Sequence, residues 1–128
     1  MLASQDRPPV RVEATLHYSA ERPFAVVMVL HAGGRDVEWH LSREQLLAGL
    51  QRRTGPGDVA VWPMIRRPGE RVVCVRLAST TPMGVVVELP RDLLQTWLVE
   101  TLRLIPRGSE MQYLHLDQEI SEIFDVEE

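Results

Sequence analysis

Three side chains that can bind a metal ion or transfer protons, Asp36, Glu38 and His40, alternate along one short segment of the chain. In a strand, alternate residues share one face, and carboxylates with an imidazole on one face are the donors of zinc sites and of general acid–base catalysis. The same alternation places Trp39 on the opposite face, so that the polar trio lies on the solvated side. We therefore expect a solvated face, with metal binding or acid–base chemistry as the alternative.

No other enzyme motif is present in the sequence. No histidine lies in an H-x-x-x-H or H-E-x-x-H arrangement, no serine lies in a G-x-S-x-G elbow, and a chain without lysine has no P-loop lysine. The glycines of T-G-P-G-D at 54–58 run from a predicted helix into a strand, which leaves no helix N-terminus to hold a phosphate. Cys74 lies in the strand-like V-V-C-V-R-L and is expected to be a small buried hydrophobe. We expect no catalytic residue, no metal site and no cofactor, and so a protein that is not an enzyme.

All fourteen basic residues are arginine, against eighteen acidic residues and a formal net charge of −4. Uniform arginine usage is typical of a GC-rich genome. The negative net charge argues against generic binding to duplex nucleic acid, which draws most of its affinity from neutralised phosphates.

A local basic patch is still possible around the turn that follows Trp62. We predict a partner surface formed by three arginines at this turn: Arg66, Arg67 and Arg71. With Arg52 and Arg53 nearby, Trp62 could stack against the bases of a single-stranded nucleic acid. The alternative places Arg52 and Arg53 at a helix C-terminus, where the macrodipole favours them, and Trp62 in the core.

Hydrophobic periodicity divides the chain into short strands and two main helices. Strands are predicted at 10–16, 24–31, 37–41, 59–63, 71–78, 85–89 and 111–116, with Pro63 ending the fourth of them and turns at 66–70 and 80–84. A capping box of Ser42 and Gln45 begins a helix that ends near residue 51, and a second helix covers 91–104. Asp117 is predicted to cap a last helix that runs to residue 124.

This order predicts an α+β fold of one domain with a mainly antiparallel sheet. The elements follow as βββα twice over, with a C-terminal helix. The βαβ alternation that a doubly wound nucleotide-binding fold requires does not occur in the predicted order. Residues 1–9 are predicted to be a flexible arm, and residues 10–128 a single domain. The start of the chain shows no secretion signal, and the longest apolar run is too short to cross a bilayer, so the cytoplasm is the expected location.

Two apolar surfaces are wide enough to bury residues between subunits. The segment from Phe24 to Leu30 is apolar on both faces, and the second helix carries a broad stripe. Burial in the chain's own core is the default for both. The residues predicted for a possible subunit interface are Phe24, Val26, Met28, Leu30, Trp97 and Leu98.

The motifs V-E-W, L-L-A-G-L and T-G-P-G-D-V-A-V-W-P, between residues 37 and 63, resemble the signature of the SsgA-like proteins. The similarity extends through P-F-A-V at 23–26, V-V-C-V-R-L-A-S at 72–79, E-L-P-R-D-L-L at 88–94, P-R-G-S-E at 106–110 and L-D-Q-E-I-S-E-I at 116–123. These proteins are regulators of sporulation and cell division in filamentous actinomycetes.

The resemblance implies a non-enzymatic protein whose fold is similar to the Whirly-type single-stranded nucleic-acid binders and which assembles as a homo-oligomer, with a trimer favoured. It also implies an adaptor that acts at septum sites, where it recruits or positions FtsZ together with another SsgA-like protein. Contact with the membrane would then be indirect, through division proteins. Single-stranded nucleic-acid binding on a Whirly-like fold is the alternative function, although we expect protein partners and not nucleic acid.

Overall fold

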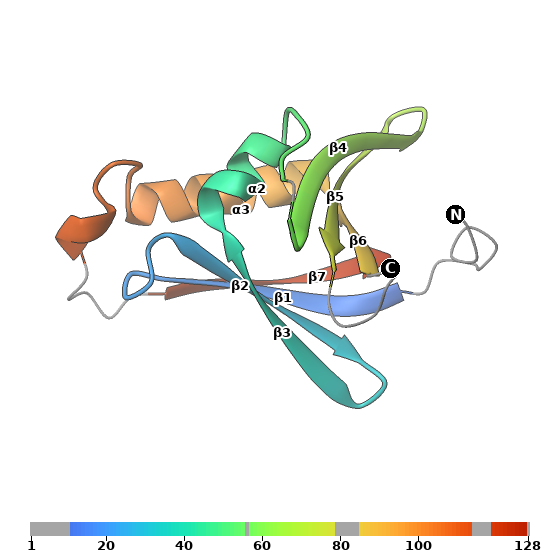
Figure 1. The fold of residues 1–128 in the computed structure, drawn as a ribbon, viewed down its shortest axis with the longest axis horizontal. Coiled ribbons are helices and arrows are strands. Elements are labelled where there is room, and N and C mark those ends of the chain that lie inside the picture. Colours follow the sequence, from blue (N-terminus) through green and yellow to red (C-terminus); the bar gives the residue numbers. More distant parts are fainter. Residues whose placement is uncertain (1–10, 56, 79–84, 114–118, 128) are drawn as a thin grey trace.

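The protein folds as a seven-stranded antiparallel sheet with two helices, as the computed structural model shows for residues 11–55, 57–78, 85–113 and 119–127 (Figure 1). The elements are β1 (Arg11–Ser19), β2 (Ala25–Ala32), β3 (Arg35–Ser42), α2 (Arg43–Gly49), β4 (Val59–Arg67), β5 (Glu70–Leu77), β6 (Val85–Pro90), α3 (Arg91–Leu104), the 3-10 helix η1 (Glu110–Tyr113) and β7 (Glu119–Glu127). The α+β class and the repeated βββα order are confirmed. The arm predicted at 1–9 and the turn predicted at 80–84 lie outside the described residues.

The sheet has the order β3-β2-β1-β7-β6-β5-β4, so β3 and β4 are its edge strands. It bends around the helices, with β1, β2, β3 and β7 below them and β4, β5 and β6 at their side in Figure 1. The two halves meet where β7 pairs with β6, at the register pair Glu88 and Glu127. β7 also pairs with β1 over the full length of both strands.

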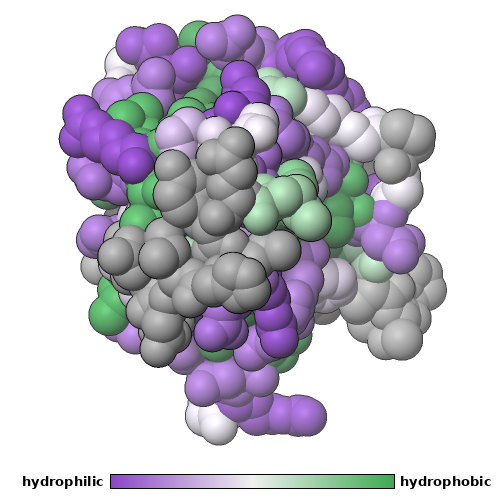
Figure 2. Space-filling view, turned by 90° about the vertical axis from the view of Figure 1, so that its left-hand side faces the viewer, coloured by the Kyte–Doolittle hydropathy of each residue, from purple (hydrophilic) through white to green (hydrophobic). Residues whose placement is uncertain are grey.

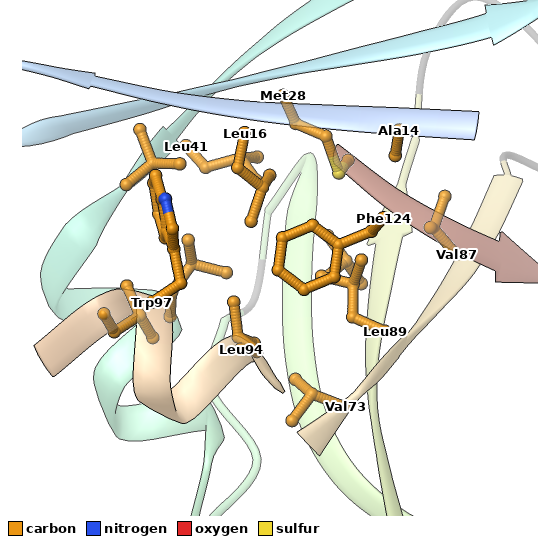
Figure 3. Close-up of a cluster of buried hydrophobic side chains, with 14 of the residues drawn as sticks. Ala14, Leu16, Met28, Leu41, Val73, Val87, Leu89, Leu94, Trp97 and Phe124 are labelled. Atoms are coloured by element: carbon orange, nitrogen blue, oxygen red, sulfur yellow. The ribbon is translucent and has the colours of Figure 1, made fainter. Parts of the chain in front are cut away.

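One hydrophobic core fills the space between this sheet and the helices. Figure 3 shows Phe124 of β7 in the middle of the core, between side chains of both halves of the sheet and of α3. Trp97 and Leu94 extend from α3 toward it, so that the helix stripe predicted from sequence does face the sheet. Leu93, near the start of the same helix, is 60% exposed.

The start of α2 ties the helix to β4. The Ser42 hydroxyl accepts a hydrogen bond from the Gln45 backbone N–H at 3.1 Å, as the capping box predicts. The Gln45 side chain does not return to the cap, because its Nε2 donates to the carbonyl of Val59 at 3.0 Å. The first hydrogen bond of the predicted capping box is therefore present. The second is replaced by a hydrogen bond that joins α2 to β4.

The prediction of a C-terminal helix is wrong, because residues 119–127 form β7. A helix there would bury one stripe, whereas the strand satisfies its backbone along all of β1 and places Phe124 and Val126 in the core, 2% and 1% exposed. The strand predicted at 111–116 is wrong as far as Tyr113, which ends η1. Residues 114–116, and Asp117 as a helix cap, lie outside the described residues.

The prediction that Pro63 ends its strand is also wrong. β4 continues to Arg67 and pairs Pro63 with Val73. Proline has no N–H for a ladder, but an edge strand needs hydrogen bonds on only one side. Pro63 is tolerated because β4 lies at the edge of the sheet.

Candidate functional site

The sheet edge at β4 borders a groove with a volume of about 570 Å³. We call it the edge groove. It is lined by Leu50 and Gln51 at the end of α2, Pro63, Met64 and Ile65 of β4, Arg71 of β5 and Arg91 at the start of α3. Ile65 is 68% exposed and Met64 36%, so the groove offers apolar surface to solvent.

Part of the β4 edge is already hydrogen-bonded within the chain. The N–H and carbonyl of Val61 pair with Thr54 at 3.0 and 2.7 Å, and the carbonyl of Val59 accepts from Gln45. Backbone groups of alternate residues point to the same side of a strand. The backbone groups of Pro63 and Ile65 therefore point to the same side of β4 as those of Val61. Within the described residues, no backbone group forms a hydrogen bond with them on that side.

Positive charge surrounds this open edge. Arg71 is exposed and lies directly across from Ile65 in the β4–β5 register, and no carboxylate pairs with it among the residues that the structure describes. Arg91 is held in place, since its Nε donates to the Leu50 carbonyl at 3.1 Å and its Nη1 to Gln95. Arg53 lies over the Trp62 ring at 4.6 Å. The groove thus combines an apolar wall with fixed and free guanidinium groups.

The three arginines predicted as a partner surface have different surroundings. Arg66 pairs with Glu70 at 3.2 Å and Glu88 at 3.4 Å, and Arg67 pairs with Glu70 at 2.9 Å. These carboxylates offset the charge of both arginines. Arg71 is the member of the set that lines the groove.

The residues predicted for a subunit interface lie mostly inside the chain. Five of the six are no more than 5% exposed: Val26, Met28, Leu30, Trp97 and Leu98. Phe24 is 53% exposed and is the member of the set with a large surface for a partner. Self-association stays a prediction.

The polar trio on β3 is split between two pairs. The Glu38 carboxylate lies 3.0 Å from His40, whereas Asp36 lies 2.8 Å from His31 of β2. Asp36, Glu38 and His40 are exposed, as the solvated-face interpretation requires, and within the described ranges no three such side chains converge on a metal position. His31 also bonds Thr15, so its imidazole has a partner on each side.

A buried ion pair that the sequence interpretation missed joins Arg43 and Glu110. The Arg43 side chain is 1% exposed, and its Nη2 donates to the Glu110 carboxylate at 3.0 Å. Its Nη1 donates to the carbonyls of Thr101 and Ile105 at 3.1 and 2.8 Å, and its guanidinium lies 5.0 Å from the Tyr18 ring. Arg43 is the first residue of α2, where a positive charge is unfavourable because of the helix macrodipole. This unfavourable position was the sign in the sequence that Arg43 has a structural partner. The pair anchors the end of α3 and is structural.

At the end of the molecule near this ion pair, the described residues offer only small areas of apolar surface. Figure 2 shows that, apart from the atoms drawn in grey, this side is mostly hydrophilic, with small separate apolar patches. A broad apolar patch is a frequent sign of a protein interface. This face therefore gives less support to partner binding than the edge groove does.

The family profile described as "Streptomyces sporulation and cell division protein, SsgA" matches residues 12–110. The chain belongs to the SsgA family. Sporulation-specific cell division protein SsgB of Streptomyces coelicolor is 42% identical over 114 residues, which cover 88% of this chain and 81% of that relative. SsgB of Thermobifida fusca is 39% identical over 119 residues, or 91% of this chain and 84% of the relative.

Solved structures of SsgA-family proteins share the fold. A structure from work on SsgB mutations and longitudinal cell division during sporulation of Streptomyces coelicolor has a TM-score of 0.69 at 31% identity, covering 84% of this chain and 98% of that one. The SsgA-like sporulation-specific cell division protein from Thermobifida fusca YX-ER1 also has a TM-score of 0.69, at 30% identity over 84% and 88% of the two chains. The recognition of this actinomycete family from its motifs is confirmed.

Proposed function

We propose that the chain is a non-enzymatic adaptor of sporulation-associated cell division, which recruits or positions division proteins such as FtsZ at septum sites. The observation that carries this proposal is the identity of 42% to an SsgB protein across most of both chains. The relatives are described as sporulation-specific cell division proteins. A role in sporulation division is thus supported by the whole length of the similarity.

The arrangement of side chains supports binding rather than chemistry. The candidate acid–base residues of β3 are exposed and divided between two pairs, whereas the edge groove presents apolar surface and arginines together. An adaptor needs such a surface and no reactive group. We place the partner-binding function at this groove.

The proposed place of action is the cytoplasmic side of the septum. Among the described residues, neither helix has both the length and the apolar content that a bilayer crossing requires. We propose that the chain reaches the membrane only through division proteins.

Self-association is part of the proposal, with a trimer favoured. Phe24 supplies an exposed aromatic side chain immediately before β2. Sedimentation equilibrium of the chain and of Phe24→Ser will measure the assembly. A wild-type chain that stays monomeric at all concentrations would refute this part.

Single-stranded nucleic-acid binding is a second candidate, which the contact between Arg53 and Trp62 favours. The Whirly-like comparison behind it stays a prediction. The net charge of −4 and the pairing of Arg66 and Arg67 with carboxylates support the protein adaptor instead. Salt-dependent oligonucleotide binding that is lost in an Arg66/Arg67 double substitution would place this function first.

The test of the adaptor is direct association with purified FtsZ. We expect the chain to co-sediment with FtsZ polymers and to change their light scattering, alone or together with a second SsgA-like protein. A heat-denatured sample of the same chain is the control. No association with FtsZ, with an SsgA-like protein or with membrane-bound division proteins would refute the proposal.

A further inference from the structure

We propose that the edge groove binds an extended, acidic and apolar segment of a partner protein, which adds to β4 as a further strand. The inference rests on the proposed function, in which the chain holds other proteins. It names the chemistry of the bound segment and the residues that recognise it.

Judged from the residues that the structure describes, the backbone of β4 offers unpaired groups only over its second half. Thr54 and Gln45 cover the edge at Val61 and Val59, so a new strand cannot pair there without displacing them. At Pro63 and Ile65 the open side presents two carbonyls and the single N–H of Ile65, since proline has none. An incoming segment would therefore bind mainly by donating its own N–H groups to these carbonyls.

The side chains around this edge specify an apolar position in the segment. Strand addition takes its affinity from the main chain and its specificity from pockets for alternate side chains. Ile65, exposed by 68%, and Pro63 share one face of β4 and line the groove beside Leu50. An apolar side chain on the same face of the added strand would cover Ile65.

The charges specify an acidic position beside it. Arg71 lies across from Ile65 without a carboxylate partner among the described residues. Arg91, which also lines the groove, is held by the Leu50 carbonyl and lies 3.9 Å from the exposed Asp92 carboxylate. A guanidinium binds a carboxylate with two parallel hydrogen bonds. The protein as a whole carries a net charge of −4, so the groove differs in sign from the protein's overall charge. An acidic segment is therefore attracted to the groove and repelled by the protein's overall charge.

A second copy of β4 fits the groove less well than a foreign acidic segment. Pairing two β4 strands would bring together the two grooves, each lined by Arg71 and Arg91, and like charges that face one another across an interface are unfavourable. The occupant is therefore assigned to a partner protein.

The probe is a short fluorescein-labelled peptide in which Ile and Glu alternate, measured by fluorescence anisotropy against the full chain. We expect it to bind, whereas the matched peptide with Lys in place of Glu does not. We also expect that methylating every backbone amide of the acidic peptide abolishes binding, because its N–H donors are lost while its side chains remain. Equal binding of the Lys peptide or of the methylated peptide would overturn the proposal.

Two charge reversals locate the site. Arg71→Glu should weaken binding of the acidic peptide by about tenfold or more, since it replaces attraction by repulsion at the groove. Arg35→Glu changes the net charge equally at the exposed β2–β3 turn and should leave binding within about twofold. Equal effects of the two variants would overturn the assignment.

Other occupants are separate outcomes of the same experiments. Displacement of the peptide by a single-stranded oligonucleotide, or an oligomer of the chain that Arg71→Glu dissociates, would each overturn the proposal. If Arg71→Glu still co-sediments with FtsZ polymers and the peptides do not bind, the groove assignment fails while the adaptor function stands. If no division protein binds the chain but the acidic peptide does, the adaptor function fails.

Discussion

Single residues that could carry chemistry are placed in this fold so that they do not react. Cys74 is 1% exposed on β5, and burial raises its pKa to about 12, with Glu88 adding to the shift and Arg66 opposing it. A thiol reacts as its thiolate, so this cysteine is inert while the protein is folded. Its buried position agrees with the expectation from sequence.

The thiol of Cys74 should report global unfolding. Near pH 8 a pKa of about 12, against an ordinary value of 9.0, leaves about a thousandfold less thiolate, and burial also blocks the reagent. We expect no reaction with Ellman's reagent in native protein and full reaction in denaturant. Rapid labelling under native conditions would show that β5 opens or is less buried.

Glu110 is the second residue whose surroundings fix its charge. A hydrogen bond from its own backbone N–H lowers the pKa of the Glu110 carboxyl below the ordinary value of 4.5. Burial raises this pKa, and hydrogen bonds from Arg43 and from the N–H of Gly108 lower it further. The folded state therefore binds this proton less readily than the unfolded chain. The resulting stability is fully present above about pH 4.5 and is lost as the pH falls through the folded pKa.

Glu110→Gln should remove this part of the acid sensitivity. We expect the variant to be less stable than wild type near neutral pH. The difference should begin to shrink below about pH 4.5, and it should level off only below the lowered pKa of Glu110 in the folded protein, where both side chains are neutral. Urea denaturation across the pH range measures it. A difference that is the same at all pH values would contradict the assigned role.

At the scale of elements, α2 contacts β4 closely enough to exclude a methyl group. A Cβ added to Gly49 would clash with Val61 Cγ1 and would lie 2.8 Å from its Cβ, and Val61 is fully buried. The contact holds α2 against the strand whose open edge borders the groove. Gly49 is thus required for close approach and not for a special φ, since its backbone is helical.

Gly49→Ala should destabilise the fold by about 1–3 kcal/mol through overpacking. Thermal or chemical denaturation measures the loss. Combining it with Val61→Ala tests the cause, because the second change makes room for the methyl group. The double variant should lose less than the sum of the two single losses; simple additivity would show that the contact is not the reason.

At the scale of the whole molecule, the last strand joins the two halves of the sheet. β7 pairs with β1 along its whole length and meets β6 at Glu88, and its Phe124 lies in the middle of the core (Figure 3). The partners β1 and β7 are separated by nearly the whole chain. The fold is therefore complete only when the C-terminal segment has paired.

Deleting residues 119–128 should abolish cooperative unfolding, because the edges of β1 and β6 and the core around Phe124 would be exposed. Phe124→Ala, the milder change, should cost about 3–5 kcal/mol. Circular dichroism during heating and size-exclusion chromatography measure both. A truncated chain that still melts cooperatively would show that β7 is not essential.

Elements with strong local signals could be predicted from the amino-acid sequence alone. Alternation placed the first and third strands, apolar runs bounded by turn residues placed the other four of the first six, and Ser42 and the apolar stripe located the two helices. The turn at Pro68 and Gly69 also followed from residue type. The motifs between residues 37 and 63 identified the SsgA family before the comparisons confirmed it.

Contacts between residues distant in sequence became known from the three-dimensional fold. The segment with Ile123 and Phe124 has a pattern compatible with a helix or a strand, and it becomes β7 because β1 supplies a full-length partner. The pair of Arg43 and Glu110 and the groove at Ile65 and Arg71 likewise depend on which strands are neighbours and which edge is left open. Local sequence does not encode such juxtapositions, because they follow from long-range pairing and from the space that the core leaves unfilled.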